Sequence, residues 1–280
     1  EKIMDHPCFD ENAHFRVGRI HLPVAPKCNI KCRYCEAGIC SDSDVRGVPG
    51  ATLRVMSPSE VLSVVKNAIN ADPRNKIVAV AGPGDPLANQ QTFETLALVK
   101  NHFPQLKTCL CTNGLLLPEK IHQLSNIDYI TVTINAVTPK TAKKIYRWIN
   151  LDGKKSKDFE VLLRNQRLGI QLASELGITV KINTVLIPGI NEHEIEDIAR
   201  WASSYAYIMN VMPLIPRGEF KSRKRPSCAQ MDRARLAVSK HMRLFTCCKQ
   251  CRADAIGVPG EVGYHKERSD LKFQHISEGL

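Results

Sequence analysis

The stretch PKCNIKCRYCEAGIC, residues 26–40, decides how the rest of the chain is interpreted. It places Cys28, Cys32 and Cys35 on one short segment, separated by three and then two residues, with Tyr34 directly before the third cysteine. Three thiolates on one loop can bind three irons of a four-iron, four-sulfur cluster, which leaves the fourth iron open to a small molecule. Zinc sites more often pair one CxxC with a second pair that completes a tetrahedron. The spacing therefore favours an iron–sulfur cluster over zinc or scattered core cysteines.

Composition indicates one large cytoplasmic domain. The chain has 280 residues, 43% of them hydrophobic, and no apolar run reaches the roughly 18 residues that a membrane helix needs. No secretory signal is visible at its start. Eleven cysteines, an odd number grouped in motifs, favour thiolate–metal chemistry in a reducing compartment over disulfides. The net charge of +11 favours a cavity for anions or an acidic redox partner, and no arginine-rich or aromatic-interleaved motif supports nucleic-acid binding.

Hydrophobic patterning predicts six strands that alternate with helices. The expected strands are 19–24, 77–81, 106–111, 129–134, 178–187 and 207–212. The expected helices are 58–70, 92–102, 118–124, 139–149, 159–176, 192–204 and 228–244, with a charged linker at 152–157. Six such units form a parallel sheet but are too few for an eight-stranded barrel. The expected fold is α/β, a partial TIM barrel of (β/α)6 type over 19–213, with extensions at 1–18 and 214–280.

Two segments at strand ends are candidates for ligand binding. Gly82-Pro83-Gly84-Asp85-Pro86 follows the second strand, where glycines let a ligand approach the backbone closely. Ile187-Pro188-Gly189 ends the fifth strand. Asn183 lies on that strand. Its position is as compatible with a contact to a ribose as with a side chain that only hydrogen-bonds to backbone at the strand end.

Other cysteines and histidines stand near these strands. Cys248 and Cys251 form a CxxC, and Cys40 follows the first motif by five residues. Cys8 precedes the first strand, and His21 lies within it. Cys109 and Cys111 share one face of the third strand because alternate residues of a strand point the same way, although buried free cysteines are also common in cores.

In combination, these features resemble the radical SAM superfamily, whose clusters bind S-adenosylmethionine (SAM). Within it they resemble the NifB family of nitrogenase cofactor assembly. The matching stretches are HPCFDENAHFRVGRIHLPVAPKCNIKCRYC, AGPGDPLAN, CTNGLLLP, TVTINAV, VKINTVLIPGIN, VMPL and CKQCRADAIG. They cover nearly the whole chain in order. Family members often carry a C-terminal carrier-like domain that is not in this sequence, so the resemblance implies the short form.

The resemblance implies a radical SAM enzyme with lyase-type SAM cleavage plus methyl transfer. The open iron of a cluster on Cys28, Cys32 and Cys35 would chelate SAM, and an electron would cleave SAM to methionine and a 5′-deoxyadenosyl radical. The implied SAM-binding residues are Gly82, Pro83, Gly84, Asp85, Asn113, Asn135, Asn183, Ile187 and Gly189.

The resemblance also implies two further four-iron clusters, which are substrates. The first would be held by Cys8, His21 and Cys109, and the second by Cys40, Cys248 and Cys251. Cys109 is preferred to Cys111 because the family's cysteine usually stands three residues before the Thr of TNG. Cys111, Cys228 and Cys247 are left over, with Cys247 an alternative to Cys248. The segment after Cys35 departs from the commoner family pattern, so Ser43 and Asp44 receive no acid or base role.

The implied reaction fuses the two substrate clusters around a carbide. One SAM would donate a methyl to a cluster sulfide, and the radical from a second SAM would remove hydrogen from that methyl, giving the 8Fe-9S-C precursor of the FeMo cofactor. The implied partners are SAM, iron–sulfur cluster donors, a nitrogenase assembly scaffold or carrier, and a reducing ferredoxin-like donor, with no membrane and no nucleic acid.

Three other functions compete with this one. A radical SAM enzyme that modifies a peptide or small molecule would need fully ligated auxiliary clusters for electron transfer. A non-enzymatic iron–sulfur scaffold or carrier would not need the GPGDP or IPGINE segments. A zinc-binding nucleic-acid module is motivated only by the net charge and the CxxC.

Overall fold

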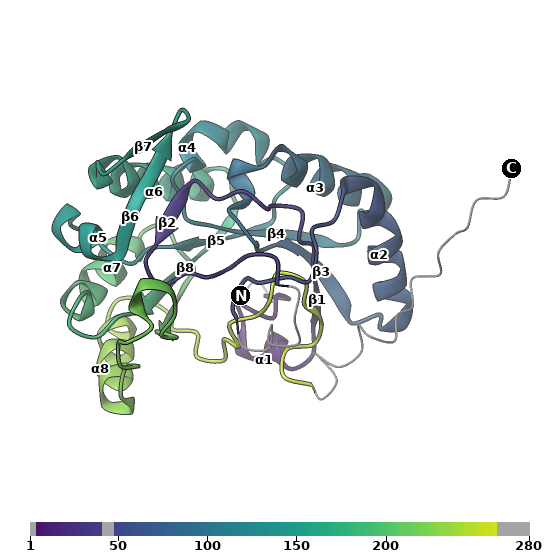
Figure 1. Ribbon diagram of the computed structural model, residues 1–280. Helices are drawn as coiled ribbons and strands as arrows, with labels where there is room; N and C mark the ends of the chain where they lie inside the picture. The colour runs from purple at the N-terminus through teal and green to yellow at the C-terminus, as the bar shows by residue number, and fades with distance from the viewer. Residues whose placement is uncertain (1–3, 41–47, 262–280) are drawn as a thin grey trace, which may run out of the picture.

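The computed structural model describes residues 4–40 and 48–261, and it is built on one curved sheet with the strand order β10-β1-β3-β4-β5-β8-β9 (Figure 1). The bounds are β1 (Gly18–His21), β3 (Asn75–Val80), β4 (Lys107–Thr112), β5 (Tyr129–Thr133), β8 (Thr179–Leu186), β9 (Ile208–Pro213) and β10 (Ile256–Gly257). Neighbouring strands from β1 to β9 are parallel, and β10 runs antiparallel to β1. The six parallel strands confirm the predicted partial TIM barrel of (β/α)6 type.

Helices cover the outer face of this sheet (Figure 1). Their bounds are α2 (Pro58–Ala71), α3 (Gln90–His102), α4 (Leu117–Lys120), α5 (Pro139–Ile145), α6 (Phe159–Glu175), α7 (Ile195–Ala202) and α8 (Cys228–Ser239). Short 3-10 turns lie at η2 (Pro86–Ala88), η3 (Ile121–Gln123), η4 (Glu192–Glu194) and η5 (Gly218–Phe220). The predicted start of α2 is confirmed, since the Ser57 N–H donates to the Glu60 carboxylate at 2.8 Å. The last predicted helix is too long, because the chain leaves α8 and pairs with β9 at Leu244.

The two faces of the sheet differ because side chains alternate along each strand. The residues that face the helices are apolar and join the main core, among them Ile20, Val78, Leu110, Ile130 and Val180. The alternate residues face the concave side and include Arg19, His21, Cys109, Cys111 and Lys181. Polar and sulfur-containing side chains are therefore collected inside the curve of the sheet.

A small three-stranded sheet corrects the prediction between 139 and 157. It contains β2 (Ile30–Cys32), β6 (Tyr146–Leu151) and β7 (Lys154–Ser156) in the order β2-β6-β7. The expected helix to 149 ends at Ile145, and the expected linker is the turn of a hairpin. Asp152 and Gly153 both have positive φ, 49° and 81°, as a two-residue hairpin turn requires. The Asp-Gly pair after a run of aromatic and β-branched residues was the signal for this hairpin.

The two ends of the described chain meet on the concave side of the sheet. Figure 1 shows α1 (Glu11–His14) beside the segment that leads to β10, both next to β1. The Thr246 hydroxyl donates to the Glu11 carboxylate at 2.7 Å, and Arg19 donates to the carbonyl of Gly257 at 2.9 Å. No helix in residues 4–40 and 48–261 has the length and apolar character to cross a membrane.

Candidate functional site

The loop after β1 gathers Cys28, Cys32 and Cys35. The strand β2 aligns Cys32 with Tyr146 of the hairpin, and the Cys35 N–H donates to the Cys32 carbonyl at 3.2 Å. The Cys35 thiol accepts from the Ala37 N–H at 3.3 Å. These bonds fold the segment into a tight turn that presents three thiols together.

The three thiols affect one another electrostatically. Loss of water around the thiol, together with the charges of Asp85 and Cys35, raises the pKa of Cys28 to about 12. Burial also raises the pKa of Cys32, and the charges of Cys35 and Cys28 raise it by smaller amounts. Three thiolates at this spacing therefore repel, and a cationic iron centre bound to all three would remove that repulsion. The donor set fits a cluster with one open iron.

Tyr34, the aromatic residue of the motif, is fastened to the main sheet by Asn135. The amide of fully buried Asn135 donates to the Tyr34 hydroxyl at 2.9 Å and to the Tyr146 hydroxyl at 3.3 Å. Its carbonyl oxygen accepts from the Val185 N–H at 2.8 Å. The side chain of Asn135, predicted to bind SAM, is thus occupied in holding the cysteine loop against β5 and β8.

The Gly82–Gly84 segment after β3 packs directly on the same loop. The Gly84 N–H donates to the Ala25 carbonyl at 2.6 Å, and Ala25 also forms a bridge with Pro83. A Cβ on Gly84 would lie 2.2 Å from the carbonyl oxygen of Lys27, so only glycine fits there. Close approach between two backbones, which the sequence suggested for a ligand, occurs here within the protein itself.

Asp85 joins the ends of β3 and β4. Its carboxylate accepts from the Thr112 hydroxyl at 2.9 and 3.0 Å, from the Asn113 N–H at 2.7 Å and from the Leu87 N–H at 3.0 Å. Burial raises the pKa of Asp85 to about 6, although these hydrogen bonds act in the opposite direction. Asp85 is thus a buried acid beside the Cys28 thiol.

The remaining predicted SAM contacts lie around the same edge. The Asn113 amide donates to the Asn29 side chain at 2.6 Å, and the Asn183 side chain accepts from Asn210 at 3.3 Å. Ile187 is fully buried, and Gly189 has a φ of +73°. All these residues, like the cysteine loop, lie at or near the carboxyl ends of parallel strands, which is the usual mouth of a TIM-type barrel.

On the concave face of the sheet, His21 and Cys109 belong to one row, meaning a line of residues paired across neighbouring strands. His21 pairs with Ala79 across β1 and β3, and Ala79 pairs with Cys109 across β3 and β4. Residues paired in this way point to the same face, so the three side chains stand side by side on the concave face. The next row contains Cys111, Thr131 and Lys181.

His21 is oriented as metal-binding histidines are. Its Nδ1 lies 2.8 Å from the carbonyl oxygen of Arg252. A carbonyl only accepts, so Nδ1 carries the proton and the lone pair is on Nε2. A backbone carbonyl that fixes the tautomer is the common outer partner of a ligating histidine.

Cys8 lies close to the CxxC of the C-terminal segment. Burial raises the pKa of its thiol to about 12, Lys181 and Arg19 lower it, and Cys251 and Cys248 raise it. The Cys251 thiol accepts from the Arg19 guanidinium at 2.7 Å. The structure therefore brings predicted ligands of both substrate clusters into one interior region.

Cys40 reaches this region through a loop. Its N–H donates to the Thr52 carbonyl at 2.9 Å, and the Gly50 N–H donates to the Cys251 carbonyl at 3.0 Å. The segment 50–52 thus bridges the two cysteines. Ser43 and Asp44, which follow Cys40, lie outside the described residues.

The unassigned cysteines differ in position. Cys111 shares a hydrogen bond with Cys109, which raises the pKa of Cys109 and lowers that of Cys111. Cys247 is half-buried beside the apolar cluster that contains Phe245, and Cys228 is exposed at the start of α8. Cys111 faces the interior rows, and the cluster on which Cys247 packs also contains Ala79 and Cys109.

Three charged or titratable interior residues were missed from the sequence. Lys181 and Arg19 are buried, with exposures of 2% and 1%. His6 is also buried: its Nδ1 accepts from the Cys8 N–H at 3.0 Å, and its Nε2 has no hydrogen-bond partner among the described residues. The signal was present, because Arg19 and Lys181 occupy alternate positions of strands that were correctly predicted.

A zinc site is not formed by the residues that the structure describes. No three His, Cys, Asp or Glu side chains in 4–40 and 48–261 surround a common point at metal-ligand distance. Zinc needs its ligands around one ion, whereas the cysteines of a four-iron cluster bind different irons.

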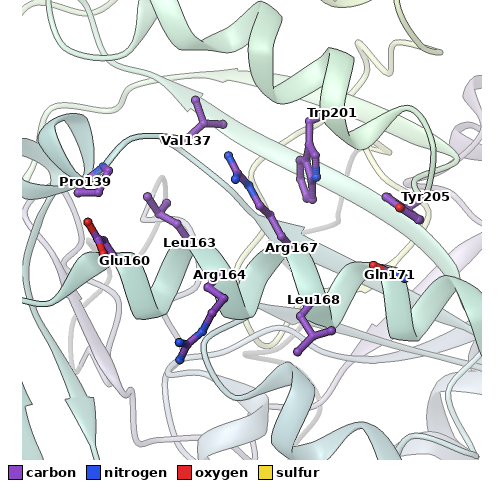
Figure 2. Close-up of a pocket in the computed structure, with 10 residues that line it drawn as sticks. All are labelled: Val137, Pro139, Glu160, Leu163, Arg164, Arg167, Leu168, Gln171, Trp201 and Tyr205. Carbon is purple, nitrogen blue, oxygen red and sulfur yellow. The ribbon is translucent and has the colours of Figure 1, made fainter.

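The outer surface offers a groove unrelated to this site. Figure 2 shows it beside α6, with Arg167 and Trp201 facing each other across it, and its volume is about 500 Å³. The Arg167 guanidinium lies 5.8 Å from the centre of the Trp201 ring. None of the predicted site residues lines this groove.

Comparisons with known proteins agree with the geometry. Residues 22–202 match the family model of the Radical SAM superfamily. Over 267 residues the chain is 42% identical to the FeMo cofactor biosynthesis protein NifB of Methanocaldococcus infernus, covering 94% of this chain and 88% of that protein. The NifB protein of Klebsiella pneumoniae is 39% identical over 274 residues, covering 93% of this chain and 58% of its own length.

Solved structures are similar in fold. Streptococcus suis SuiB bound to S-adenosylmethionine has a TM-score of 0.61 at 14% identity, covering 81% of this chain and 50% of that chain. A radical SAM methyltransferase from Sphaerobacter thermophilus has a TM-score of 0.54 at 17% identity, covering 82% of this chain and 64% of that chain. At such identities the likeness concerns the fold alone. From the family model and the curated relatives together, the chain belongs to the NifB family of the radical SAM superfamily.

Proposed function

We propose that this radical SAM enzyme acts in FeMo cofactor biosynthesis, where it fuses two [4Fe–4S] clusters and inserts a SAM-derived carbide to form the 8Fe-9S-C precursor. The observation that supports this most is the interior group of Cys8, Cys109, Cys248 and Cys251, which is separate from the three-cysteine loop at the mouth. A radical SAM enzyme that needed only one cluster would have no use for a second set of thiols in the interior of the sheet.

Cys28, Cys32 and Cys35 would hold the resident [4Fe–4S] cluster. When bound, this cluster supplies the electron that cleaves SAM to methionine and a 5′-deoxyadenosyl radical. Asn135 keeps the loop in place through Tyr34, and Gly84 lets the next strand end pack against it. These contacts fix the position of the three thiols before any ligand binds.

The two substrate clusters would be held by few protein ligands each. We assign Cys8, His21 and Cys109 to the first, and Cys40, Cys248 and Cys251 to the second. Three protein ligands leave one iron of each cluster open, which suits clusters that must fuse and depart. His21, in place of a thiolate, would make the first cluster less negative and shift its potential.

The chemistry proposed for these substrates uses two molecules of SAM. One donates its methyl to a sulfide of a substrate cluster and leaves as S-adenosylhomocysteine. The radical from the other removes one hydrogen from that methyl and leaves as 5′-deoxyadenosine, and the two remaining hydrogens then leave as protons, so that carbide remains. Because two [4Fe–4S] clusters supply only eight sulfurs, the ninth comes from an added inorganic sulfur source. Cluster donors, a nitrogenase assembly scaffold or carrier, and a ferredoxin-like reductant are the proposed partners in the cytoplasm.

Iron counting with product analysis tests this function. After anaerobic reconstitution we expect about twelve irons per chain, because three four-iron clusters bind. Adding SAM and dithionite should then yield both S-adenosylhomocysteine and 5′-deoxyadenosine. About four irons with 5′-deoxyadenosine alone would instead indicate a radical SAM enzyme of another kind, and bound irons without SAM cleavage would indicate a scaffold or carrier.

Two variants sharpen the result. His21→Ala should lower the yield of the carbide precursor, and an unchanged yield would count against His21 as a ligand. Cys228→Ser is the matched control, because this thiol is exposed on the outer helix α8. Its iron content and products should equal those of the unmodified protein.

A further inference from the structure

Lys181 is a lysine enclosed by the interior of the sheet. It lies on β8, faces the concave side and is 2% exposed. Its ammonium donates to the Cys8 carbonyl at 2.7 Å and lies 4.4 Å from the centre of the Phe245 ring. A lysine this deeply buried is rare unless an opposite charge accompanies it.

No carboxylate pairs with Lys181 among the residues that the structure describes. Lys100 and Lys107 show the contrast, since both pair with the Asp128 carboxylate, at 2.7 and 2.9 Å. One carbonyl and one aromatic face compensate a buried ammonium only in part. Within residues 4–40 and 48–261, the carboxylates therefore leave a positive charge unbalanced inside the barrel.

Several groups surround this ammonium: the rings of Phe9 and Phe245, the imidazole of His6, and the thiols of Cys8, Cys109 and Cys111. Cys111 stands in the same row, with only Thr131 between it and Lys181. Arg19 lies on the opposite side of the thiols, with its guanidinium 2.7 Å from Cys251. The interior thiols thus lie between two cations.

We propose that Lys181 is a positioning residue for the substrate cluster assigned to Cys8, His21 and Cys109: its ammonium compensates the negative charge of the bound cluster and donates a hydrogen bond to one of its sulfurs. This inference rests on the proposed function. A cluster with thiolate ligands is an anion, and burying it beside a fixed positive charge costs less than burying it alone. Net charge and hydrogen bonds to sulfur also set a cluster's potential.

A purely structural role would predict different behaviour. In that case Lys181 serves only to tie the Cys8 carbonyl, and with it the N-terminal segment, to β8. Removing the ammonium would then destabilise the protein without iron. If Lys181 serves the cluster, the iron-free protein keeps or gains stability when the uncompensated charge is removed. The variant then binds less iron than the unmodified protein when it is reconstituted.

The experiment compares Lys181→Met and Lys181→Gln with the unmodified chain and with Lys107→Met, which changes a solvent-exposed strand lysine paired with Asp128. Each protein is melted without iron, reconstituted anaerobically, and examined by iron counting and by a redox titration followed by electron paramagnetic resonance. For both Lys181 variants we expect an unchanged or higher melting temperature and a fall from about twelve irons to about eight, or a more negative midpoint potential of the retained cluster. Lys107→Met should load fully.

Glutamine separates the two roles because it can still donate to the Cys8 carbonyl but has no charge. Full iron content and an unchanged potential in Lys181→Gln would overturn the proposal, whether or not Lys181→Met loads. The same holds if both variants load fully at the original potential. If the unmodified chain itself took up only about four irons, the proposed function would fail first, and that result is distinct from the behaviour of the variants.

Discussion

His21 and Cys109 lie on the concave face of the sheet, on strands two apart, and Ala79 of the strand between them pairs with both. Two strand spacings separate their backbones by about 10 Å, and Ala79 fills little of that gap. A larger side chain at this position would project into the space between the two proposed ligands. The small residue in the middle of the row is therefore as important to the proposed site as the ligands beside it.

Ala79→Leu should displace the first substrate cluster. The added side chain occupies the space between His21 and Cys109, so reconstituted iron should fall by about four per chain while the SAM cluster remains. Overpacking destabilises a protein by about 1–3 kcal/mol, so the melting temperature should fall. Val80→Ile adds bulk to the opposite face of the same strand and serves as the control. If both variants lose iron equally, general destabilisation explains the loss.

Cys109→Ser and Cys111→Ser separate two neighbouring thiols. Cys109 is in the row of His21, and Cys111 is in the row of Lys181. We expect Cys109→Ser to lose about four irons and Cys111→Ser to retain nearly all of them. Iron counting of both variants, prepared in parallel, is sufficient. The reverse result would move the ligand assignment to Cys111.

The raised pKa of Asp85 predicts that the free energy of unfolding depends on pH. Its pKa of about 6 in the folded protein exceeds the value of about 3.9 in an unfolded chain, so the folded state binds the proton more tightly. The resulting stabilisation is complete below about pH 4 and is lost as the pH rises through about 6. Two pKa units correspond to about 3 kcal/mol.

Urea denaturation of the iron-free protein between about pH 4 and pH 8 measures this effect. The difference in unfolding free energy between the original protein and Asp85→Asn should decline by about 2–3 kcal/mol across that range, because asparagine does not titrate. A difference that stays constant with pH would mean that Asp85 titrates at its ordinary value. Glu119→Gln is a suitable control, since Glu119 is exposed.

Much of the fold follows from the sequence because the parallel strands are short, apolar and regularly spaced. The hairpin of β6 and β7 was missed because Tyr146 directly continues a helical segment. Whether such a stretch continues a helix or pairs as a strand depends on a partner, here β2, more than one hundred residues earlier. Local propensity does not contain that pairing.

The candidate site was predictable to a similar extent and for similar reasons. Motif spacing locates Cys28, Cys32 and Cys35, which fold locally. Lys181 has no motif around it, and its importance appears only when β8 curls toward Cys8 across 173 positions of sequence. Asn135 stays a predicted SAM contact, and the structure adds that its amide donates to the Tyr34 hydroxyl. Sequence indicates that such a residue is polar and near a strand end, but not which partner it meets.

Asn135 and Tyr34 provide the last prediction, because one hydrogen bond of 2.9 Å joins them. Tyr34→Phe removes this bond together with the hydrogen bond between the Tyr34 hydroxyl and the Cys32 thiol, so it should cost about 0.5–1.5 kcal/mol of stability per bond and slow 5′-deoxyadenosine formation. Asn135→Ala should cost more, since the Val185 N–H then loses its acceptor in a buried position. If the bond to Tyr34 positions the cysteine loop, the double variant should lose less activity than the sum of the two single losses, measured as free energies of activation. Strictly additive losses would show that the two residues act independently, and Asn135 would then be free to act on SAM through another contact.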